Sequence, residues 1–122
     1  MKKVRTNYVD GFVLAVPTRN KAAYVKMARL SLKLFRELGA LRLVEAWPDD
    51  VPKGRLADFY RSVKAKRSES VVFAWIEWPS RKVRNAAMKR MRDDPSFQAQ
   101  FKDIPFDGKR MIFGGFSTVV DG

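Results

Sequence analysis

The spacing of apolar and polar residues divides the chain into strands and helices in a definite order. Residues Tyr8–Val16 form a nearly continuous apolar run that ends at Pro17, a pattern that predicts a strand buried on both faces. Shorter apolar, aromatic or β-branched runs bounded by turn residues predict the other strands. These predicted strands cover Leu41–Trp47, Phe59–Val63, Val71–Trp78 and Lys109–Val120.

Two amphipathic helices separate the predicted strands. The first is predicted over Asn20–Leu38, with Asn20 as its N-cap and Gly39 just beyond its end. The second is predicted over Ser80–Arg92, and a short helical turn at Phe97–Phe101 follows it. In both long helices, Lys and Arg residues lie opposite the apolar arc. The outer face of each helix is therefore expected to be basic.

The resulting order is β-α-β-(β)-β-α-β, which is the split βαβ pattern of an α+β, ferredoxin-like fold. Right-handed crossovers place both helices on one face of an antiparallel sheet. A chain of 122 residues is the right length for one domain of this kind. We therefore expect residues 1–122 to form a single domain.

The predicted sheet carries large apolar side chains on both faces. Adjacent pairs such as Phe12–Val13 and Ile112–Phe113 place one bulky group on each side, and Phe73 and Trp75 add two aromatic rings. An apolar face of this size exceeds what monomeric proteins usually expose. Either a second subunit or a stacked ligand is therefore expected to cover the face that the helices leave open.

The amino-acid composition excludes several classes of site but does not identify a particular one. The chain has 25 Lys and Arg against 13 Asp and Glu, a net charge of +12, and neither Cys nor His. Disulfides, thiolate or imidazole metal sites, His-ligated haem and Cys–His or Ser–His nucleophiles are thereby excluded. The acidic pairs Asp49–Asp50 and Asp93–Asp94 cannot supply the oxygen ligands of a calcium site alone. We expect no metal and no cofactor.

No segment of the sequence predicts membrane insertion. Lys2, Lys3 and Arg5 resemble the basic start of a signal peptide, but the apolar run Phe12–Val16 is too short to complete one. No stretch approaches the length of a membrane span. The expected location is the cytoplasm, without a membrane partner.

Four motifs resemble the YbaA-like bacterial family of unknown function over nearly the whole chain. They are Tyr8–Phe12, Glu45–Pro52, Val72–Pro79 and Pro105–Ile112. That family is similar to the dimeric α/β-barrel superfamily, so the resemblance implies a ferredoxin-like protomer and a homodimer whose sheets pack face to face. It implies no particular activity.

Several charged residues lie within otherwise apolar predicted strands. Asp10, Glu77 and Arg110 are the candidate catalytic residues, with Glu45 and Arg42 nearby. A carboxylate in an apolar strand is costly unless paired, and burial moves its pKa toward values useful in acid–base chemistry. In the functional interpretation, Asp10 or Glu77 abstracts a proton and Arg110 binds an anion. In the structural interpretation, the same residues form an ion-pair network.

Aromatic residues beside predicted loops are the candidate ligand-binding groups. Trp47, Tyr60 and Trp75 could line a pocket for a planar ligand. Aromatic side chains on a sheet can equally belong to a core or to a subunit interface. The sequence leaves both interpretations open for these three residues.

Two functions follow from these observations. The favoured one is a homodimer that binds or transforms a small molecule in the cleft between sheet and helices. The alternative is an RNA-binding or other nucleic-acid-binding protein that uses the basic helices or the aromatic strand 71–78, which partly matches an RNA-recognition signature. The basic residues, however, are predicted on the opposite side from that aromatic face.

Overall fold

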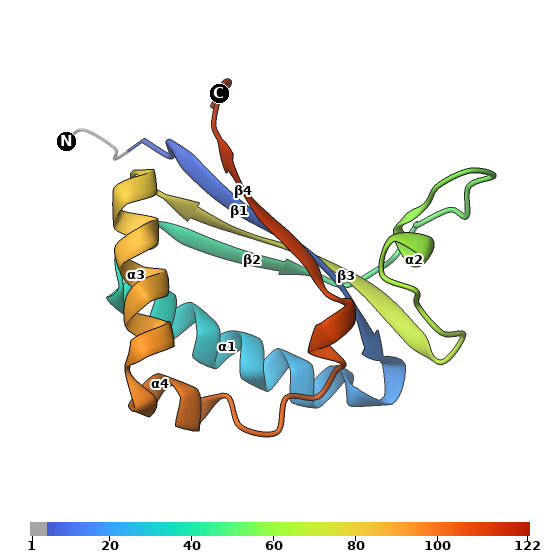
Figure 1. The fold of residues 1–122 in the computed structure, drawn as a ribbon. Coiled ribbons are helices and arrows are strands. Elements are labelled where there is room, and N and C mark those ends of the chain that lie inside the picture. Colours follow the sequence, from blue (N-terminus) through green and yellow to red (C-terminus); the bar gives the residue numbers. More distant parts are fainter. Residues whose placement is uncertain (1–4) are drawn as a thin grey trace.

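A four-stranded antiparallel sheet forms the centre of the computed structural model, which describes residues 5–122 (Figure 1). Lys2 and Lys3, considered above as the start of a signal peptide, lie outside the described residues. The sheet has the strand order β2-β3-β1-β4. The strands are β1 (Tyr8–Pro17), β2 (Arg42–Ala46), β3 (Glu69–Trp78) and β4 (Ile112–Ser117).

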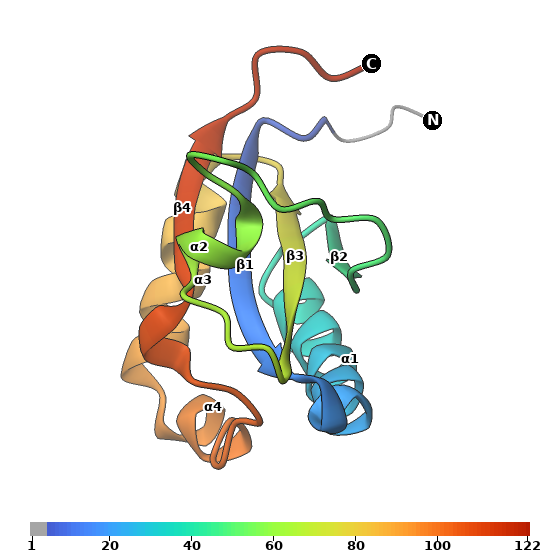
Figure 2. The same ribbon diagram turned by 90° about the vertical axis from the view of Figure 1, so that its right-hand side faces the viewer.

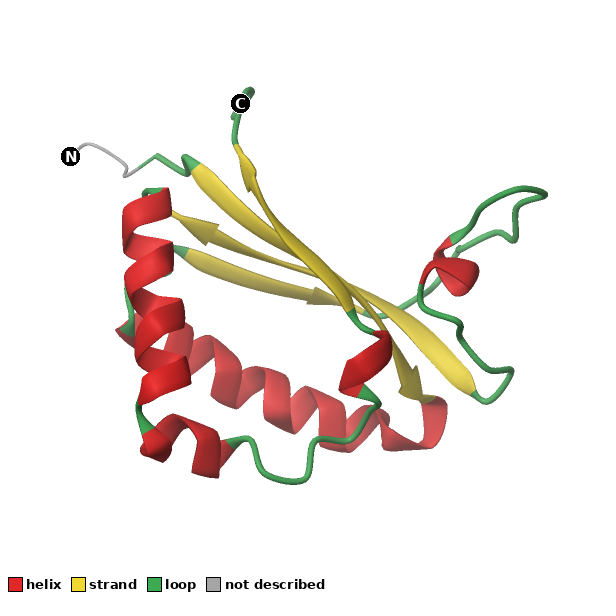
Figure 3. Ribbon diagram, in the orientation of Figure 1, coloured by secondary structure: helices red, strands yellow, loops and turns green. Residues whose placement is uncertain are grey.

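Three helices cover one face of this sheet, and a single short helix lies on the other side (Figures 1 and 2). The covering helices are α1 (Lys21–Glu37), α3 (Arg81–Asp93) and α4 (Pro95–Gln100). The helix on the opposite side is α2 (Phe59–Ser62). This arrangement confirms the prediction of an α+β, ferredoxin-like fold, with its helices and strands distributed as Figure 3 shows.

The register of the central strands decides which side chains face the helices. Tyr8 pairs with Trp78, and Leu14 pairs with Val72, so alternate residues from these positions point toward α1 and α3. Trp78 and Ile76 are almost completely buried in one core cluster, and Leu14 and Val72 are buried in another. These two core clusters therefore lie between the sheet and the helices.

Local sequence explains most helix boundaries. Ser80 begins α3 as predicted, because its hydroxyl accepts a hydrogen bond from the amide of Val83 at 3.1 Å. Gly39 follows α1 at φ 108°, a conformation that glycine adopts readily. The predicted capping role of Asn20 is wrong. A 3₁₀ turn precedes α1, and the Asn20 side chain instead donates to the carbonyl of Pro105 at 2.9 Å.

The predicted strand Phe59–Val63 is also wrong, because this segment forms helix α2. Asp58 caps the helix by accepting a hydrogen bond from the amide of Arg61 at 2.7 Å. Phe59 and Val63 are four residues apart and so lie on one face of a helical turn. Val63, only 1% exposed, packs against the side of the sheet that α1 and α3 do not cover.

The last strand is shorter than the predicted Lys109–Val120. Gly108–Arg110 forms a 3₁₀ turn in which the Asp107 carboxylate accepts a hydrogen bond from the Lys109 amide, and β4 begins only at Ile112. At the other end, Ser117 pairs with Tyr8, the first residue of β1. One more backbone hydrogen bond, from the Thr118 amide to the Asn7 carbonyl at 3.1 Å, lies just beyond this pair.

Candidate functional site

A cleft of about 230 Å³ opens between α1 and β2. Helix α1 forms one wall, and the helix-facing side of β2 forms the other. Most of its walls are apolar, and Glu45 and Arg29 are the charged residues among them. Its lining residues are Tyr24, Val25, Ala28, Arg29, Leu32, Leu43, Glu45, Ala46, Trp47 and Val72.

Tyr24 and Glu45 form the polar centre of this cleft. The Tyr24 hydroxyl lies 2.8 Å from Oε1 and 3.1 Å from Oε2 of Glu45. Burial raises the pKa of Glu45, and the hydrogen bond from Tyr24 offsets part of that rise. Burial together with the neighbouring carboxylate raises the pKa of Tyr24 far above its ordinary range. Tyr24 therefore stays a neutral donor, while Glu45 accepts a proton more readily than an exposed glutamate.

Trp47, a predicted ligand-binding residue, lines the same cleft. Its ring centre lies 6.4 Å from that of Tyr24, with the rings inclined at 51°. The ammonium group of Lys21 lies 5.3 Å from the centre of the Trp47 ring. An aromatic surface, a carboxyl group and the basic side chain of Arg29 therefore line one cavity, and Lys21 lies beside it over the Trp47 ring.

The sequence interpretation did not join Tyr24 to this site. By its spacing, Tyr24 is one of the apolar-arc residues of the first predicted helix, and Glu45 is one of several charged residues within the predicted strands. A signal was nevertheless present, because a carboxyl at a helix-facing strand position needs a donor from the helix above it. Tyrosine is the natural donor on an otherwise apolar helix face.

The other two predicted aromatic ligands lie elsewhere. The Tyr60 hydroxyl donates to the carbonyl of Val51 at 2.7 Å, which ties α2 to the loop before it. Trp75 lies on the open side of the sheet, where its Nε1 donates to Glu77 at 2.9 Å. The structure therefore does not bring Trp47, Tyr60 and Trp75 into one pocket.

The side of the sheet opposite α1 and α3 carries an apolar groove of about 530 Å³, which we call the open face. Phe73, Ile112 and Phe116 are 45%, 45% and 63% exposed there. Phe59 from α2 packs edge-on against Phe73 with ring centres 6.1 Å apart, so α2 covers one end only. The groove is lined by Val9, Gly11, Phe12, Val13, Phe73, Trp75, Ile112, Phe113, Gly114 and Phe116.

Asp10 lies in the core, 3% exposed, on the side facing α3. Its carboxylate accepts hydrogen bonds from Trp78 Nε1 at 2.8 Å and from Arg84 Nη2 at 2.8 Å. The Arg84 guanidinium also lies 5.1 Å from the centre of the Tyr8 ring. Gly115 leaves room for this arrangement, because a Cβ there would overlap Tyr8 and lie 2.6 Å from Arg84 Nη2. Asp10 thus joins β1, β3 and α3.

Glu77 lies near one end of β3, on the open face. Its carboxylate accepts hydrogen bonds from the Thr6 hydroxyl at 3.0 Å and from Trp75 Nε1 at 2.9 Å. Arg42 approaches from β2 at 3.8 Å but remains largely exposed. Glu77 and Asp10 therefore belong to separate groups on opposite sides of the sheet.

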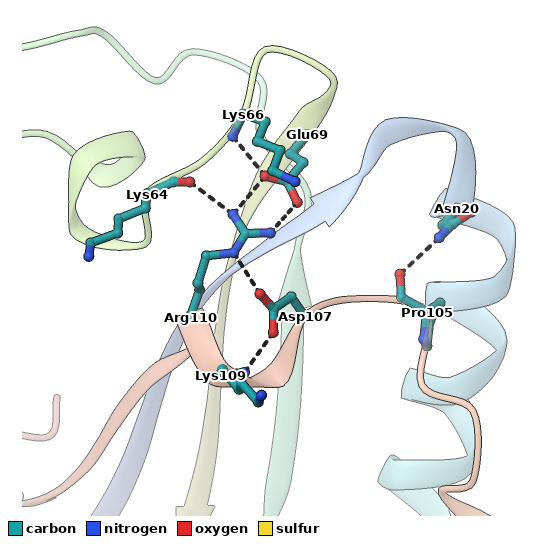
Figure 4. Close-up of polar contacts among 8 residues, drawn as sticks. All are labelled: Asn20, Lys64, Lys66, Glu69, Pro105, Asp107, Lys109 and Arg110. Atoms are coloured by element: carbon teal, nitrogen blue, oxygen red, sulfur yellow. Dashed lines mark hydrogen bonds and ion pairs between the residues drawn. The ribbon is translucent and has the colours of Figure 1, made fainter.

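Arg110 lies in the 3₁₀ turn before β4, where protein groups surround its guanidinium (Figure 4). It donates to Glu69 at 2.8 and 2.6 Å, to Asp107 at 2.9 Å and to the carbonyl of Lys64 at 2.8 Å. Nearby, Asn20 holds the carbonyl of Pro105. These contacts hold the turn against the first residue of β3 and the residue before α1. Arg110 is therefore not part of the group around Asp10.

Neither a cluster of metal ligands nor a membrane-spanning helix is found in the part of the chain that the structure describes. Across residues 5–122, His, Cys, Asp and Glu side chains do not gather in groups of three that could hold a metal ion. Over the same residues, no helix has the length and apolar character needed to cross a membrane.

The sheet order and helix placement define this chain as a ferredoxin-like α+β protein. It is similar to a solved dimeric ferredoxin-like protein from an uncultured marine organism, with a TM-score of 0.61 and 11% identity over 97% of this chain and 92% of the other. A putative antibiotic biosynthesis monooxygenase from Nitrosomonas europaea has a TM-score of 0.52 and 12% identity, covering 98% and 96% of the two chains. Likenesses at such identity concern the fold alone.

Within this fold class, the chain belongs to the DUF1428 family of proteins of unknown function, whose model matches residues 7–108. The uncharacterized protein YbaA of Escherichia coli strain K12 is 54% identical over 114 residues, covering 93% of this chain and 97% of the relative. The same protein from Shigella flexneri matches equally well. The family expected from the four sequence motifs is thereby confirmed.

Proposed function

We propose that this protein is a homodimer that binds a small molecule in the cleft between α1 and β2. The observation that carries the small-molecule function is the combination of Tyr24, Glu45 and Trp47 around one cavity. Pockets that bind small ligands are typically apolar, with a few polar groups placed to orient the ligand. The cleft has this composition, and the carboxyl group at its centre has a raised pKa.

The proposed homodimer rests on the open face. Its partly exposed aromatic and aliphatic side chains form one continuous groove, and exposing such an apolar surface to water is unfavourable. A second copy of the chain presents the same apolar surface, which suits a symmetric interface. The similar solved protein described as dimeric supports this assembly. None of the similar proteins named above supports the alternative function of nucleic-acid binding.

The assembly is tested by light scattering behind a sizing column. A particle of twice 14.0 kDa is expected for the unaltered chain. Phe116→Lys introduces a charge into the apolar groove and is expected to give a folded monomer, whereas Ala86→Lys on the exposed face of α3 should stay dimeric. A monomeric unaltered chain would refute the homodimer.

The cleft is tested by two-dimensional NMR with a library of small aromatic and aliphatic fragments. The three tryptophans report on three places: Trp47 on the cleft, Trp75 on the open face and Trp78 on the core. Fragments that bind as proposed shift the indole resonance of Trp47 and leave that of Trp78 in place. Val25→Phe narrows the cleft and should weaken binding, and Ala22→Phe on the same helix serves as control. A library that never shifts Trp47 refutes the site.

A further inference from the structure

The Glu45 carboxylate has hydrogen-bonding capacity that the protein does not use. A carboxylate accepts about four hydrogen bonds, and Tyr24 supplies a single proton shared between its two oxygens. Within residues 5–122, no other side chain donates to Glu45. Glu45 also lies opposite Ala74 of β3, which offers it no charge or donor. The remaining acceptor positions are available to a ligand that carries a hydroxyl or another donor.

The size of the cleft limits that ligand to about one ring. An apolar cavity of about 150 Å³ accommodates benzene, and the present cleft has a volume of about 230 Å³. One substituted aromatic ring therefore fits, while a fused polycyclic molecule does not fit entirely inside. The Trp47 ring offers such a ligand an aromatic surface for an offset or edge contact.

The charges around the cleft are unevenly placed. Glu45 is partly buried at the polar centre, whereas Arg29 is exposed where it lines the cavity. Lys21, also exposed, lies over the Trp47 ring. An anionic group beside Glu45 would be repelled, but the same group directed outward would meet the two cations. The arrangement fits a ligand with a donor at one end and a negative charge at the other.

We propose that the cleft binds monocyclic aromatic acids that carry a hydroxyl group. The hydroxyl donates to Glu45 beside Tyr24, the ring packs against Trp47, and the carboxylate faces Arg29 and Lys21. Tyr24 already provides an internal precedent, since its own phenolic hydroxyl donates to the same carboxylate. This ligand class rests on the small-molecule function proposed above and makes it specific.

The proposal is tested with three probes: 4-hydroxybenzoate, 4-methoxybenzoate and benzoate. Each is titrated into the unaltered protein while the Trp47 indole resonance is followed. A hydrogen bond to a charged acceptor makes 4-hydroxybenzoate bind roughly tenfold or more tightly than the other two. Glu45→Gln keeps an acceptor for Tyr24 but removes the charge, so the preference for the hydroxyl should fall by about fivefold. Arg29→Gln should weaken all three probes alike, and Arg36→Gln, outside the cleft, should weaken none.

Two results overturn the ligand class while leaving the cleft intact as a site. One is equal binding of 4-hydroxybenzoate and 4-methoxybenzoate, and the other is an unchanged preference in Glu45→Gln. Binding of 4-hydroxybenzoate that shifts Trp75 but not Trp47 overturns it as well. If none of the three probes binds but other fragments shift Trp47, the ligand class fails and the small-molecule function stands. If no compound shifts Trp47, both proposals fail.

Discussion

Neutralising Asp10 tests whether this buried carboxylate stabilises the fold. In Asp10→Asn, the negative charge beside Arg84 is lost, and an NH₂ group that cannot accept a hydrogen bond replaces one of the two oxygens that accept from Arg84 and Trp78. Breaking a buried ion pair by removing one partner costs about 3–5 kcal/mol. Because asparagine retains one acceptor oxygen, we expect a loss at the lower end of this range, a decrease of about 3 kcal/mol in the free energy of unfolding.

The assay is urea unfolding followed by circular dichroism at neutral pH. With a slope of about 2 kcal/mol per molar urea, the expected loss lowers the unfolding midpoint by about 1.5 M. All variants are compared at one protein concentration, because association stabilises the folded state by mass action.

Two further variants serve as a control and as a test of coupling between Asp10 and Arg84. Asp93→Asn removes a carboxylate whose partner, Arg92, is exposed, so it should cost less than about 1 kcal/mol. The double variant Asp10→Asn/Arg84→Met should lose less than the sum of the two single losses, because both disrupt the same interaction. A loss below about 1 kcal/mol in Asp10→Asn would refute the structural interpretation and return Asp10 to the candidates for chemistry.

Three other predictions follow from the same geometry. Gly115→Ala should cost about 1–3 kcal/mol in urea unfolding, because its methyl group would overlap Tyr8, while Gly114→Ala meets only ordinary contacts and should cost less. Glu69→Gln should lower the melting temperature most at neutral pH. Hydrogen bonds from Arg110 lower the pKa of Glu69, so its stabilisation is lost as pH falls below 4.5 through that lowered value. Glu45→Gln should show the opposite trend: burial raises the pKa of Glu45, so unaltered protein loses stability relative to the variant as pH rises above 4.5. If the melting temperature of Glu69→Gln or Glu45→Gln differs from that of the unaltered protein by the same amount at every pH, the prediction for that variant is wrong.

The fold was predictable from the sequence because its signals are local. The apolar runs of β1 and β3, the cap at Ser80 and the glycine at position 39 each act within a few residues. The errors arose where local signals conflict. In Phe59–Val63, aromatic and β-branched residues favour a strand, but Asp58 caps a helix and Val63 then reaches the core.

The candidate site was only partly predictable because its partners are distant in the sequence. Trp47 could be proposed from its place beside a loop. The pairing of Glu45 with Tyr24, however, depends on how α1 crosses β2, and that crossing has no local signature. In the same way, the residue that pairs with Asp10 is Arg84, 74 positions away on a helix whose other basic residues are mostly exposed.

The direction in which the pKa of a carboxyl group is shifted distinguishes the carboxyl groups with structural roles from the one suited to chemistry. Hydrogen bonds and basic neighbours lower the pKa of four of them: Asp58, Glu69, Asp94 and Asp107. Each of these accepts from donors in its own turn or in the segment that it anchors, so its charge serves local structure. Glu45 differs, because burial raises its pKa and Tyr24, its partner in the described chain, is neutral. A carboxyl group that lines a cavity and binds a proton readily is the one best placed to exchange a proton with a ligand. For this reason Glu45, rather than the ion-paired Asp10, is the first residue to test for chemistry.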